Sequence, residues 1–232
     1  MRAKKTQTGT TKQPKDYFKV VYKADKSGEF KQSRFDKMRD GIFVKLFNKY
    51  SKKSLSKSSI IDIGCGYGYL MDSFSAAKEV YGTDISDEAV KIAQKRNEKY
   101  KVSQMDILKP LKIKHKFDLV LAINVIEHLS KPKDGIKNIK THLNKDGLVI
   151  IHLPTINNKF SGWLYSKTYA KDPTHVYMPK GDEVKKLFTD EGFELLQESY
   201  MPYWPKFIFK HVKLHPAYMA VFRLSDTTKS VK

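Results

Sequence analysis

The short run 60–63 (IIDI), which is apolar except for Asp62, and the glycine turn 64–68 (GCGYG) constrain the fold of this chain more than any other stretch. A short run of branched apolar residues is typical of a strand buried on both faces. Glycines at alternate positions allow a tight turn and let a ligand approach the backbone, because no Cβ stands in the way. A helical pattern follows at once, so the sequence predicts a strand–turn–helix unit that binds a nucleotide-like ligand.

The rest of the chain alternates between strand and helix patterns, which favours a doubly wound, mostly parallel sheet of the Rossmann-like α/β class. Two stretches, one of about 25 residues after Pro154 and one over 200–216, predict insertions after the fifth and sixth of seven strands, and we expect loops there. The predicted strands cover 59–63, 80–83, 102–105, 117–123, 148–153, 193–199 and 218–224, and the predicted helices cover 34–50, 69–77, 86–100, 133–143 and 181–191.

These patterns divide the 232 residues into three parts. Residues 1–33 form a basic segment that we expect to be partly disordered, residues 34–58 a helix and linker, and residues 59–232 the main α/β domain. The only cysteine is Cys65, and neither a secretory signal nor a run of about 20 apolar residues is evident, which predicts a cytoplasmic protein.

The net charge of +19 is concentrated at the two ends of the chain. Residues 1–59 contain 17 Lys+Arg against 5 Asp+Glu, whereas residues 60–200 contain 21 against 19. Basic flanks of this kind suit RNA or an anionic membrane surface, and a solvated lysine-rich surface explains them equally well. Charge alone therefore leaves the partner open.

Further motifs follow the glycine turn in order. An acidic residue, Asp84, ends the second strand about 20 residues later, where a carboxylate can accept hydrogen bonds from ribose hydroxyls. The segments 104–107 (QMDI), 117–129 (FDLVLAINVIEHL) and 143–151 (LNKDGLVII) come next. Together, over about residues 58–200, these segments resemble the class I S-adenosylmethionine (SAM)-dependent methyltransferases, in the branch that acts on small molecules and lipids.

The resemblance implies a seven-stranded methyltransferase fold with SAM as cofactor. In that family the glycine turn packs on the methionine part of SAM, the acidic residue after strand two holds the ribose, and the third motif holds the adenine. The residues carried over as cofactor-binding are Asp62, Gly64, Cys65, Gly66, Gly68, Asp84, Ile85, Asp106, Ile107 and Asn124.

Two histidines are the candidates for the acceptor side. His175 lies in the insertion after strand five, where related enzymes carry a histidine near the acceptor, and it is the first candidate for a base or an acceptor-orienting group. His128 follows strand four and is the second candidate. The pair also partly resembles the metal-binding Glu-x-x-Glu-His run and later His of small-RNA 2′-O-methyltransferases. Because Asn124 replaces the first Glu of that run, we predict no metal site.

The residues after strand four bear on the chemical class of the methyl acceptor, because a motif of base N-methyltransferases is missing there. The Asn-Pro-Pro-type motif of base N-methyltransferases is missing at Asn124, which favours transfer to a hydroxyl, with an amine second, of a small-molecule, glycan or lipid-linked acceptor. The alternatives are an RNA 2′-O-methyltransferase that uses the basic flanks and a SAM-binding partner subunit without catalysis. The sequence leaves the oligomeric state open.

Overall fold

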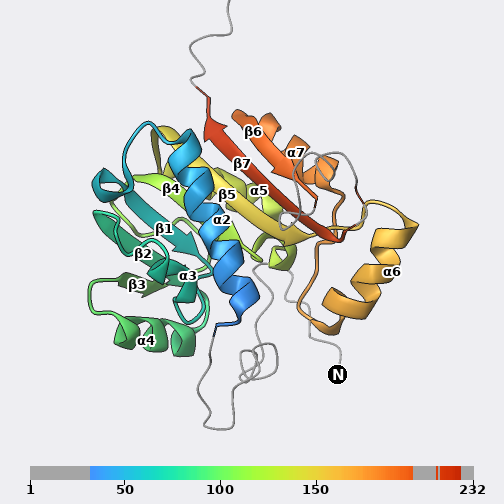
Figure 1. Cartoon of the computed structure of the whole chain (residues 1–232), viewed down its shortest axis with the longest axis horizontal. Helices are drawn as coiled ribbons and strands as arrows, with labels where there is room; N and C mark the ends of the chain where they lie inside the picture. Colours follow the sequence, from blue (N-terminus) through green and yellow to red (C-terminus); the bar gives the residue numbers. More distant parts are fainter. Residues whose placement is uncertain (1–31, 201–212, 214, 226–232) are drawn as a thin grey trace, which may run out of the picture.

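A computed structural model describes residues 32–200, 213 and 215–225 of the chain. Within them lies a seven-stranded sheet in the order β3-β2-β1-β4-β5-β7-β6 (Figure 1). Strands β1 to β5 pair in parallel, and β7 runs antiparallel to both β5 and β6. The predicted doubly wound, seven-stranded Rossmann-like fold is confirmed.

Most elements lie where the sequence patterns predict them, but three bounds were wrong: the helix predicted over 69–77 ends at Asp72, the helix predicted over 86–100 ends at Arg96, and the fifth strand begins at Leu143 and not at 148. The strands are β1 (Ser59–Ile63), β2 (Glu79–Asp84), β3 (Lys101–Gln104), β4 (Phe117–Ile123), β5 (Leu143–Pro154), β6 (Phe193–Ser199) and β7 (Ala217–Leu224). The helices are α2 (Arg34–Tyr50), α3 (Tyr69–Asp72), α4 (Asp87–Arg96), α5 (Pro132–Thr141), α6 (Lys159–Thr168) and α7 (Gly181–Asp190), with short 3₁₀ turns η1 (Leu55–Lys57), η2 (Ile126–His128) and η3 (Tyr169–Lys171).

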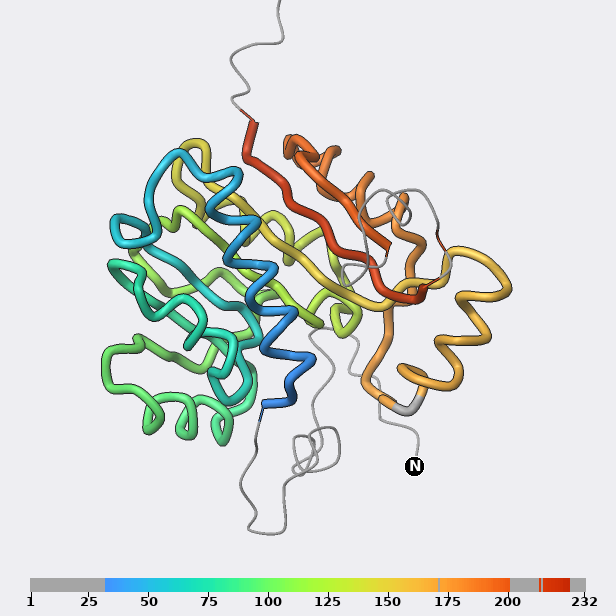
Figure 2. The backbone as a smooth tube through the Cα atoms, in the orientation of Figure 1, coloured from blue at the N-terminus to red at the C-terminus, as the bar shows by residue number. Residues whose placement is uncertain are grey.

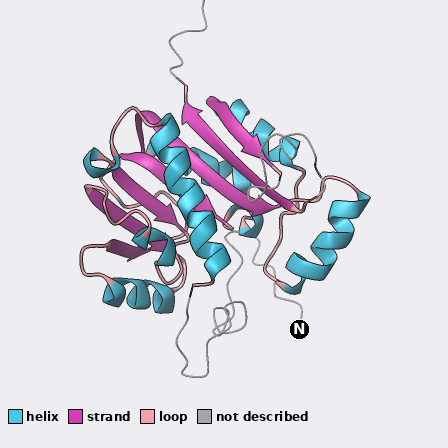
Figure 3. Cartoon of the chain, in the orientation of Figure 1, coloured by secondary structure: helices cyan, strands magenta, loops and turns pink. Residues whose placement is uncertain are grey.

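Helices cover both faces of the sheet, as Figure 3 shows, and this explains the continuous apolar runs of the central strands. Alternate residues of each strand point to opposite faces. Thus Val120 of β4 belongs to the core formed with α5 and α7, whereas its neighbour Leu119 packs in the core formed with α2 and α3. A third cluster lies between α4 and strands β2 and β3.

Helix α2 packs against the sheet, as the periodicity of its apolar residues predicts. Its buried stripe consists of Phe43, Leu46 and Phe47. At its end, the guanidinium of Arg223 on β7 donates to the carbonyl oxygen of Tyr50 at 2.8 Å. Ser33 caps its start by accepting from the N–H of Asp36. The helix therefore forms a fixed part of the fold that covers one face of the central strands.

The structure departs from the sequence reading in the segment after β5. A loop was predicted there, but residues 159–168 form helix α6. This helix lies to one side of the sheet, and the chain then returns to the sheet at α7 (Figure 2). Its start is stabilised by a reciprocal cap between Asn158 and Ser161. This prediction was wrong because the aromatic residues of the segment obscure the helical pattern.

Two other expectations fall partly or wholly outside the described residues. The basic segment 1–33 lies outside them except for Gln32 and Ser33, and so does most of the aromatic stretch 200–216. Within the part that is described, no helix is both long and apolar enough to cross a bilayer.

Candidate functional site

The carboxyl ends of the five parallel strands meet at one edge of the sheet, where open α/β sheets bind their ligands. The order of the strands reverses between β1 and β4, so the segments after these two strands lie next to each other. The residues that the sequence singled out follow strands at this edge, except Asp62 within β1, Asp84 at the end of β2, and His175 from the segment after α6.

The turn after β1 requires glycine at its first position. Gly64 has φ = 70°, a left-handed conformation that residues with a side chain rarely adopt, and a Cβ there would lie 2.5 Å from Cγ2 of Val125. Gly66 and Gly68 also have positive φ. The turn is held to β2, because the N–H groups of Gly64 and Cys65 both donate to the carbonyl oxygen of Thr83. Its backbone is therefore pressed closely against the segment that follows β4.

Asp84 links this turn to the end of β2. Its carboxylate accepts hydrogen bonds from the N–H of Gly66 at 2.9 Å and from the N–H of Ser86 at 2.8 Å. The side chain is 5% exposed, and burial raises the pKa of Asp84 while the backbone N–H groups oppose that rise. Both carboxylate oxygens are thus oriented by the backbone at the edge of the sheet.

Asp62 is buried beneath the turn, close to two other acidic side chains. Burial raises its pKa well above the usual range for a carboxyl, and the charges of Asp40 and Asp84 raise it further. Asp40 comes from α2, where its carboxylate forms an ion pair with the guanidinium of Arg39 at 3.0 Å. Sequence reasoning missed Asp40. The available signal was a charged residue on the apolar stripe of an amphipathic helix, three positions before Phe43.

Cys65 contributes through its backbone. The thiol is buried in the cluster of α4, and burial raises its pKa well above the usual range for a thiol. It is therefore a poor nucleophile, as expected from a lone cysteine.

The segment after β3 carries the residues predicted to meet an adenine. Asp106 caps a turn, because its carboxylate accepts from the N–H of Leu108 at 2.9 Å. Ile107 is buried in the main core, and Ile85, after β2, is half-buried. The N–H of Met105 donates to the carbonyl oxygen of Asp84, which ties this segment to the predicted ribose residue.

Asn124 follows β4 in a left-handed conformation, with φ = 55°. Its amide oxygen lies 3.0 Å from Nδ1 of His152 on the neighbouring strand β5. Burial lowers the pKa of His152 to about 3, so this ring is neutral at pH 7. The histidine acts as a buried hydrogen-bonding partner between β4 and β5.

The two histidines predicted for the acceptor side lie together, and a glutamate accompanies them. Glu127 and His128 belong to η2, and His175 comes from the segment after α6. The ring centroids of the two histidines are 4.9 Å apart. One ligating atom from each of the three residues lies within 4.8 Å of the other two. We refer to Glu127, His128 and His175 as the Glu-His-His cluster.

Neighbouring oxygens orient both rings of the cluster. Nδ1 of His128 lies 2.9 Å from the hydroxyl of Thr174, and Nδ1 of His175 lies 2.7 Å from the hydroxyl of Tyr165. Asp172 accepts from the N–H of Thr174 at 2.8 Å, and its other carboxylate oxygen is 3.6 Å from Nε2 of His175. Sequence reasoning missed these three supporting residues, because no spacing rule brings them next to η2.

The backbone fixes the same segment to η2. The N–H groups of Val176 and Tyr177 both donate to the carbonyl oxygen of Glu127, each at 3.0 Å. Residues far apart in the chain are therefore joined independently of their side chains.

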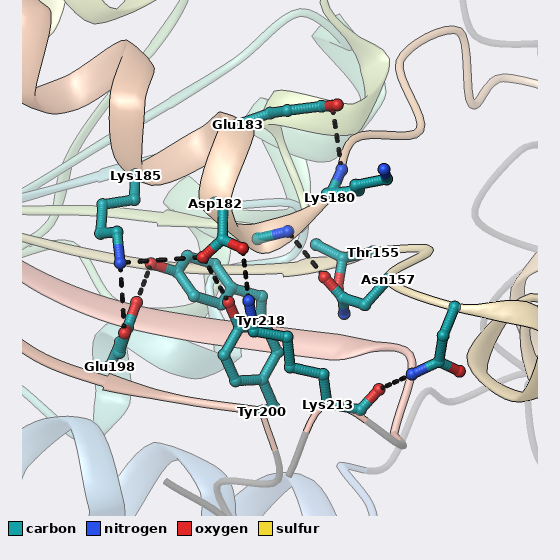
Figure 4. A network of polar contacts seen from close by, with 12 residues as sticks. Thr155, Asn157, Lys180, Asp182, Glu183, Lys185, Glu198, Tyr200, Lys213 and Tyr218 are labelled. Carbon is teal, nitrogen blue, oxygen red and sulfur yellow. Dashed lines mark hydrogen bonds and ion pairs between the residues drawn. The ribbon is translucent and has the colours of Figure 1, made fainter. Parts of the chain in front are cut away.

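Polar contacts around the start of α7 hold the end of this insertion (Figure 4). The amide oxygen of Asn157 accepts from the N–H of Gly181 at 2.9 Å, and the hydroxyl of Tyr218 donates to Glu198 at 2.9 Å. Lys185 lies between Asp182 and Glu198, at 3.7 and 3.5 Å. This network joins the segment after β5 to α7 and to the facing ends of β6 and β7.

The glycine turn after β1, the oriented carboxylate of Asp84 and the order of the strands are together features of a known family. The family model described as "Methyltransferase domain" matches residues 33–198. The chain belongs to this family. Its fold is that of the class I SAM-dependent methyltransferases, as the sequence motifs predicted.

Relatives of this methyltransferase differ in the acceptors that their names give. A tRNA U34 carboxymethyltransferase from Campylobacter jejuni is 29% identical over 150 residues, which is 60% of this chain and 50% of that protein. A ubiquinone biosynthesis O-methyltransferase from Pelagibacter ubique is 28% identical, over 61% of this chain and 62% of that protein. The chain thus spans about half the length of the first of these relatives.

Solved structures share the fold of this methyltransferase at low sequence identity. A SAM-dependent methyltransferase from Clostridium acetobutylicum superposes with a TM-score of 0.68 at 15% identity, covering 90% of this chain and 96% of that one. The plantazolicin methyltransferase BpumL, solved with a desmethyl analogue and S-adenosylhomocysteine, has a TM-score of 0.65 at 19% identity, covering 84% of this chain and 87% of that one.

Proposed function

We propose that this methyltransferase transfers the methyl group of SAM to a hydroxyl group of a small-molecule, glycan or lipid-linked acceptor. The observation that carries the proposal is the position of the Glu-His-His cluster. Glu127 and His128 of the cluster lie in η2, shortly after β4, and Val125 of the same segment packs against Gly64 of the glycine turn. Groups that suit a donor and groups that suit a polar acceptor therefore lie on adjacent strands.

The donor half of the site would be formed by the turn and the ends of β2 and β3. Each oxygen of Asp84 holds one backbone N–H and retains a further lone pair for a ribose hydroxyl. The turn 64–68 would lie against the methionine part, with Asp62 beneath it. Asp106 and Ile107 would meet the adenine. SAM itself supplies an electrophilic methyl group, so the chain needs to align the acceptor rather than create the electrophile.

The acceptor half would be formed by the Glu-His-His cluster. Burial lowers the pKa of His128 and lowers that of His175 to about 4, so both rings are neutral at pH 7. A neutral imidazole can accept a hydrogen bond from a hydroxyl group. A base with a pKa near 4 removes a proton from an alcohol or phenol poorly. We therefore assign these histidines to orienting the acceptor more than to general base catalysis.

A second candidate is methylation of a ribose hydroxyl in RNA. Two observations favour it: the net charge of +19, and the tRNA-modifying enzymes among the relatives. Against it, the residues 60–200 that contain the described site are nearly balanced in charge. The ubiquinone biosynthesis O-methyltransferases among the relatives support the first candidate.

The donor half is tested by measuring SAM affinity calorimetrically for the wild type, Asp84→Ala and Asp87→Ala. We expect Asp84→Ala to weaken binding at least tenfold, while Asp87→Ala, an exposed acid three residues away, leaves it unchanged. Circular dichroism melting shows whether Asp84→Ala still folds, and Asp84→Asn serves if it does not. Equal affinity in the wild type and a folded variant would overturn the assignment of Asp84.

The acceptor is tested with radiolabelled SAM on phenols, sugars, lipid-linked hydroxyl compounds and total RNA in parallel. Label in the hydroxyl compounds supports the proposal. Label in RNA alone, lost at high salt, would favour the second candidate. SAM binding without transfer to any acceptor would instead indicate a non-catalytic partner.

A further inference from the structure

Glu127 is the least satisfied polar side chain near the site. It is 1% exposed, and neither of its carboxylate oxygens has a hydrogen-bond partner among the described residues. Buried polar side chains are almost always hydrogen-bonded, paired with a charge or bound to a metal, so this carboxyl group calls for a partner.

The two histidines beside it are arranged as metal ligands usually are. A ligating histidine as a rule uses its second nitrogen to bond an oxygen of the protein, which fixes the ring and its tautomer. Here the hydroxyl of Thr174 lies against Nδ1 of His128, and the hydroxyl of Tyr165 lies against Nδ1 of His175. Both rings are therefore oriented by groups outside the cluster.

We propose that Glu127, His128 and His175 bind a divalent transition-metal ion, of which Zn²⁺ is the best suited and Mn²⁺ a weaker second. Two imidazole nitrogens and one carboxylate oxygen favour such ions over Mg²⁺ and Ca²⁺, which prefer oxygen ligands. The ligating atoms lie within 4.8 Å of one another. Bonds of about 2.0–2.1 Å in a tetrahedral zinc site place ligand atoms roughly 3.3 Å apart, so closure needs side-chain shifts on the order of 1 Å.

This proposal reverses the prediction made from the sequence. That prediction turned on Asn124, which stands where a glutamate ligand was expected. In the structure Asn124 lies against His152 on the neighbouring strand, whereas Asp172, from the insertion, lies 3.6 Å from His175. The sequence prediction rested on Asn124 alone and did not consider Asp172, because that carboxylate comes from a distant segment.

Three protein ligands leave a coordination position for a substrate oxygen, as in catalytic metal sites. The role of the ion rests on the proposed function. The acceptor hydroxyl would bind the ion, which lowers the pKa of that hydroxyl, and its proton would pass to solvent. The oxygen lone pair then forms the O–CH₃ bond as the S–CH₃ bonding pair returns to sulfur, which converts SAM to S-adenosylhomocysteine.

The test measures metal binding directly, on the full chain without a histidine tag. Protein is treated with EDTA, dialysed, and titrated with Zn²⁺, Mn²⁺ or Mg²⁺, with bound metal measured by mass spectrometry and thermal stability followed in parallel. We expect one equivalent of Zn²⁺ or Mn²⁺ to bind and to raise the melting temperature, and Mg²⁺ to do neither. Glu127→Gln should lose at least 90% of this binding, and His142→Gln, outside the cluster, should keep it.

Glu127→Gln removes a buried acid, so we expect the metal-free variant to fold. Failure of the folded wild type to bind either ion, or equal binding by Glu127→Gln, would overturn the proposal. SAM binding is measured on the same metal-free protein. If SAM binds and methyl transfer proceeds without metal, the inference fails while the proposed function stands; if metal binds but SAM does not, the proposed function fails and the metal site stands.

Discussion

Cγ2 of Val125 occupies the space beside Gly64, 2.5 Å from where a Cβ on that glycine would be. Gly64 begins the turn after β1, and Val125 lies in the segment after β4 that carries Glu127 and His128 of the Glu-His-His cluster. The two halves of the proposed site are therefore in direct contact. A shift of one segment is transmitted to the other.

Gly64→Ala should destabilise the fold and weaken SAM binding together. The new methyl group would overlap Val125, and φ = 70° is unfavourable for alanine. We expect a loss of about 2–4 kcal/mol in the free energy of unfolding, measured by urea denaturation. Val125→Ala in the same chain should restore about half of that loss. No rescue by the second substitution would show that the backbone conformation, and not the contact, dominates.

His152→Asn should reduce the loss of stability in acid. The folded pKa of His152 is about 3, against its ordinary value of 6.5. Between these values the unfolded chain binds the proton and the folded chain does not, so stability falls as pH falls from 6.5 toward 3. The wild type should lose up to about 5 kcal/mol at this position over that range. Asparagine retains an N–H for Asn124 and binds no proton.

The measurement is urea denaturation at pH 7, 6, 5 and 4 for the wild type, His152→Asn and the control His142→Asn. His152→Asn should show the smallest decrease with falling pH. Equal slopes for the wild type and His152→Asn would refute the assignment.

Tyr165→Phe should weaken the cluster without unfolding the protein. The hydroxyl of Tyr165 lies 2.7 Å from Nδ1 of His175, so its removal frees the ring to rotate. Loss of such a supporting group typically reduces metal affinity 10- to 100-fold. Metal titration tests this, with Tyr100→Phe as control, since that hydroxyl bonds Asp72 far from the cluster. Equal metal affinity in both variants would contradict a positioning role for Tyr165.

Ser161→Ala should loosen α6 and little else. The hydroxyl of Ser161 accepts from the N–H groups of Asn157 and Asn158, both at 2.9 Å. We expect a local loss of about 1–2 kcal/mol, seen as faster hydrogen exchange in residues 159–168. Ser166→Ala is the matched control, because its hydroxyl donates only to the carbonyl oxygen of Trp163. Unchanged exchange in Ser161→Ala would mean that packing holds the helix.

Local sequence patterns were enough to predict much of the fold and of the donor half of the proposed site. β1, β4 and β6 have the predicted bounds, because strands flanked by turns are visible in consecutive residues. Gly64 follows β1 directly and Asp84 is the last residue of β2, so their meeting at one edge follows from parallel pairing. The acceptor half depends on Tyr165, Asp172 and Thr174, which reach η2 only through tertiary folding. Helix α6 was missed for a different reason, because the aromatic residues of its segment obscure the helical pattern.

The attachment of residues 176 and 177 to Glu127 uses main-chain groups alone. Substitutions at these two positions therefore leave the anchor intact, provided that proline is avoided. Related chains could therefore differ in sequence at residues 176 and 177 and accept different substrates, while the position of the Glu-His-His cluster stays the same. For protein engineering, the same property makes these two residues the natural positions to randomise when a different acceptor is sought.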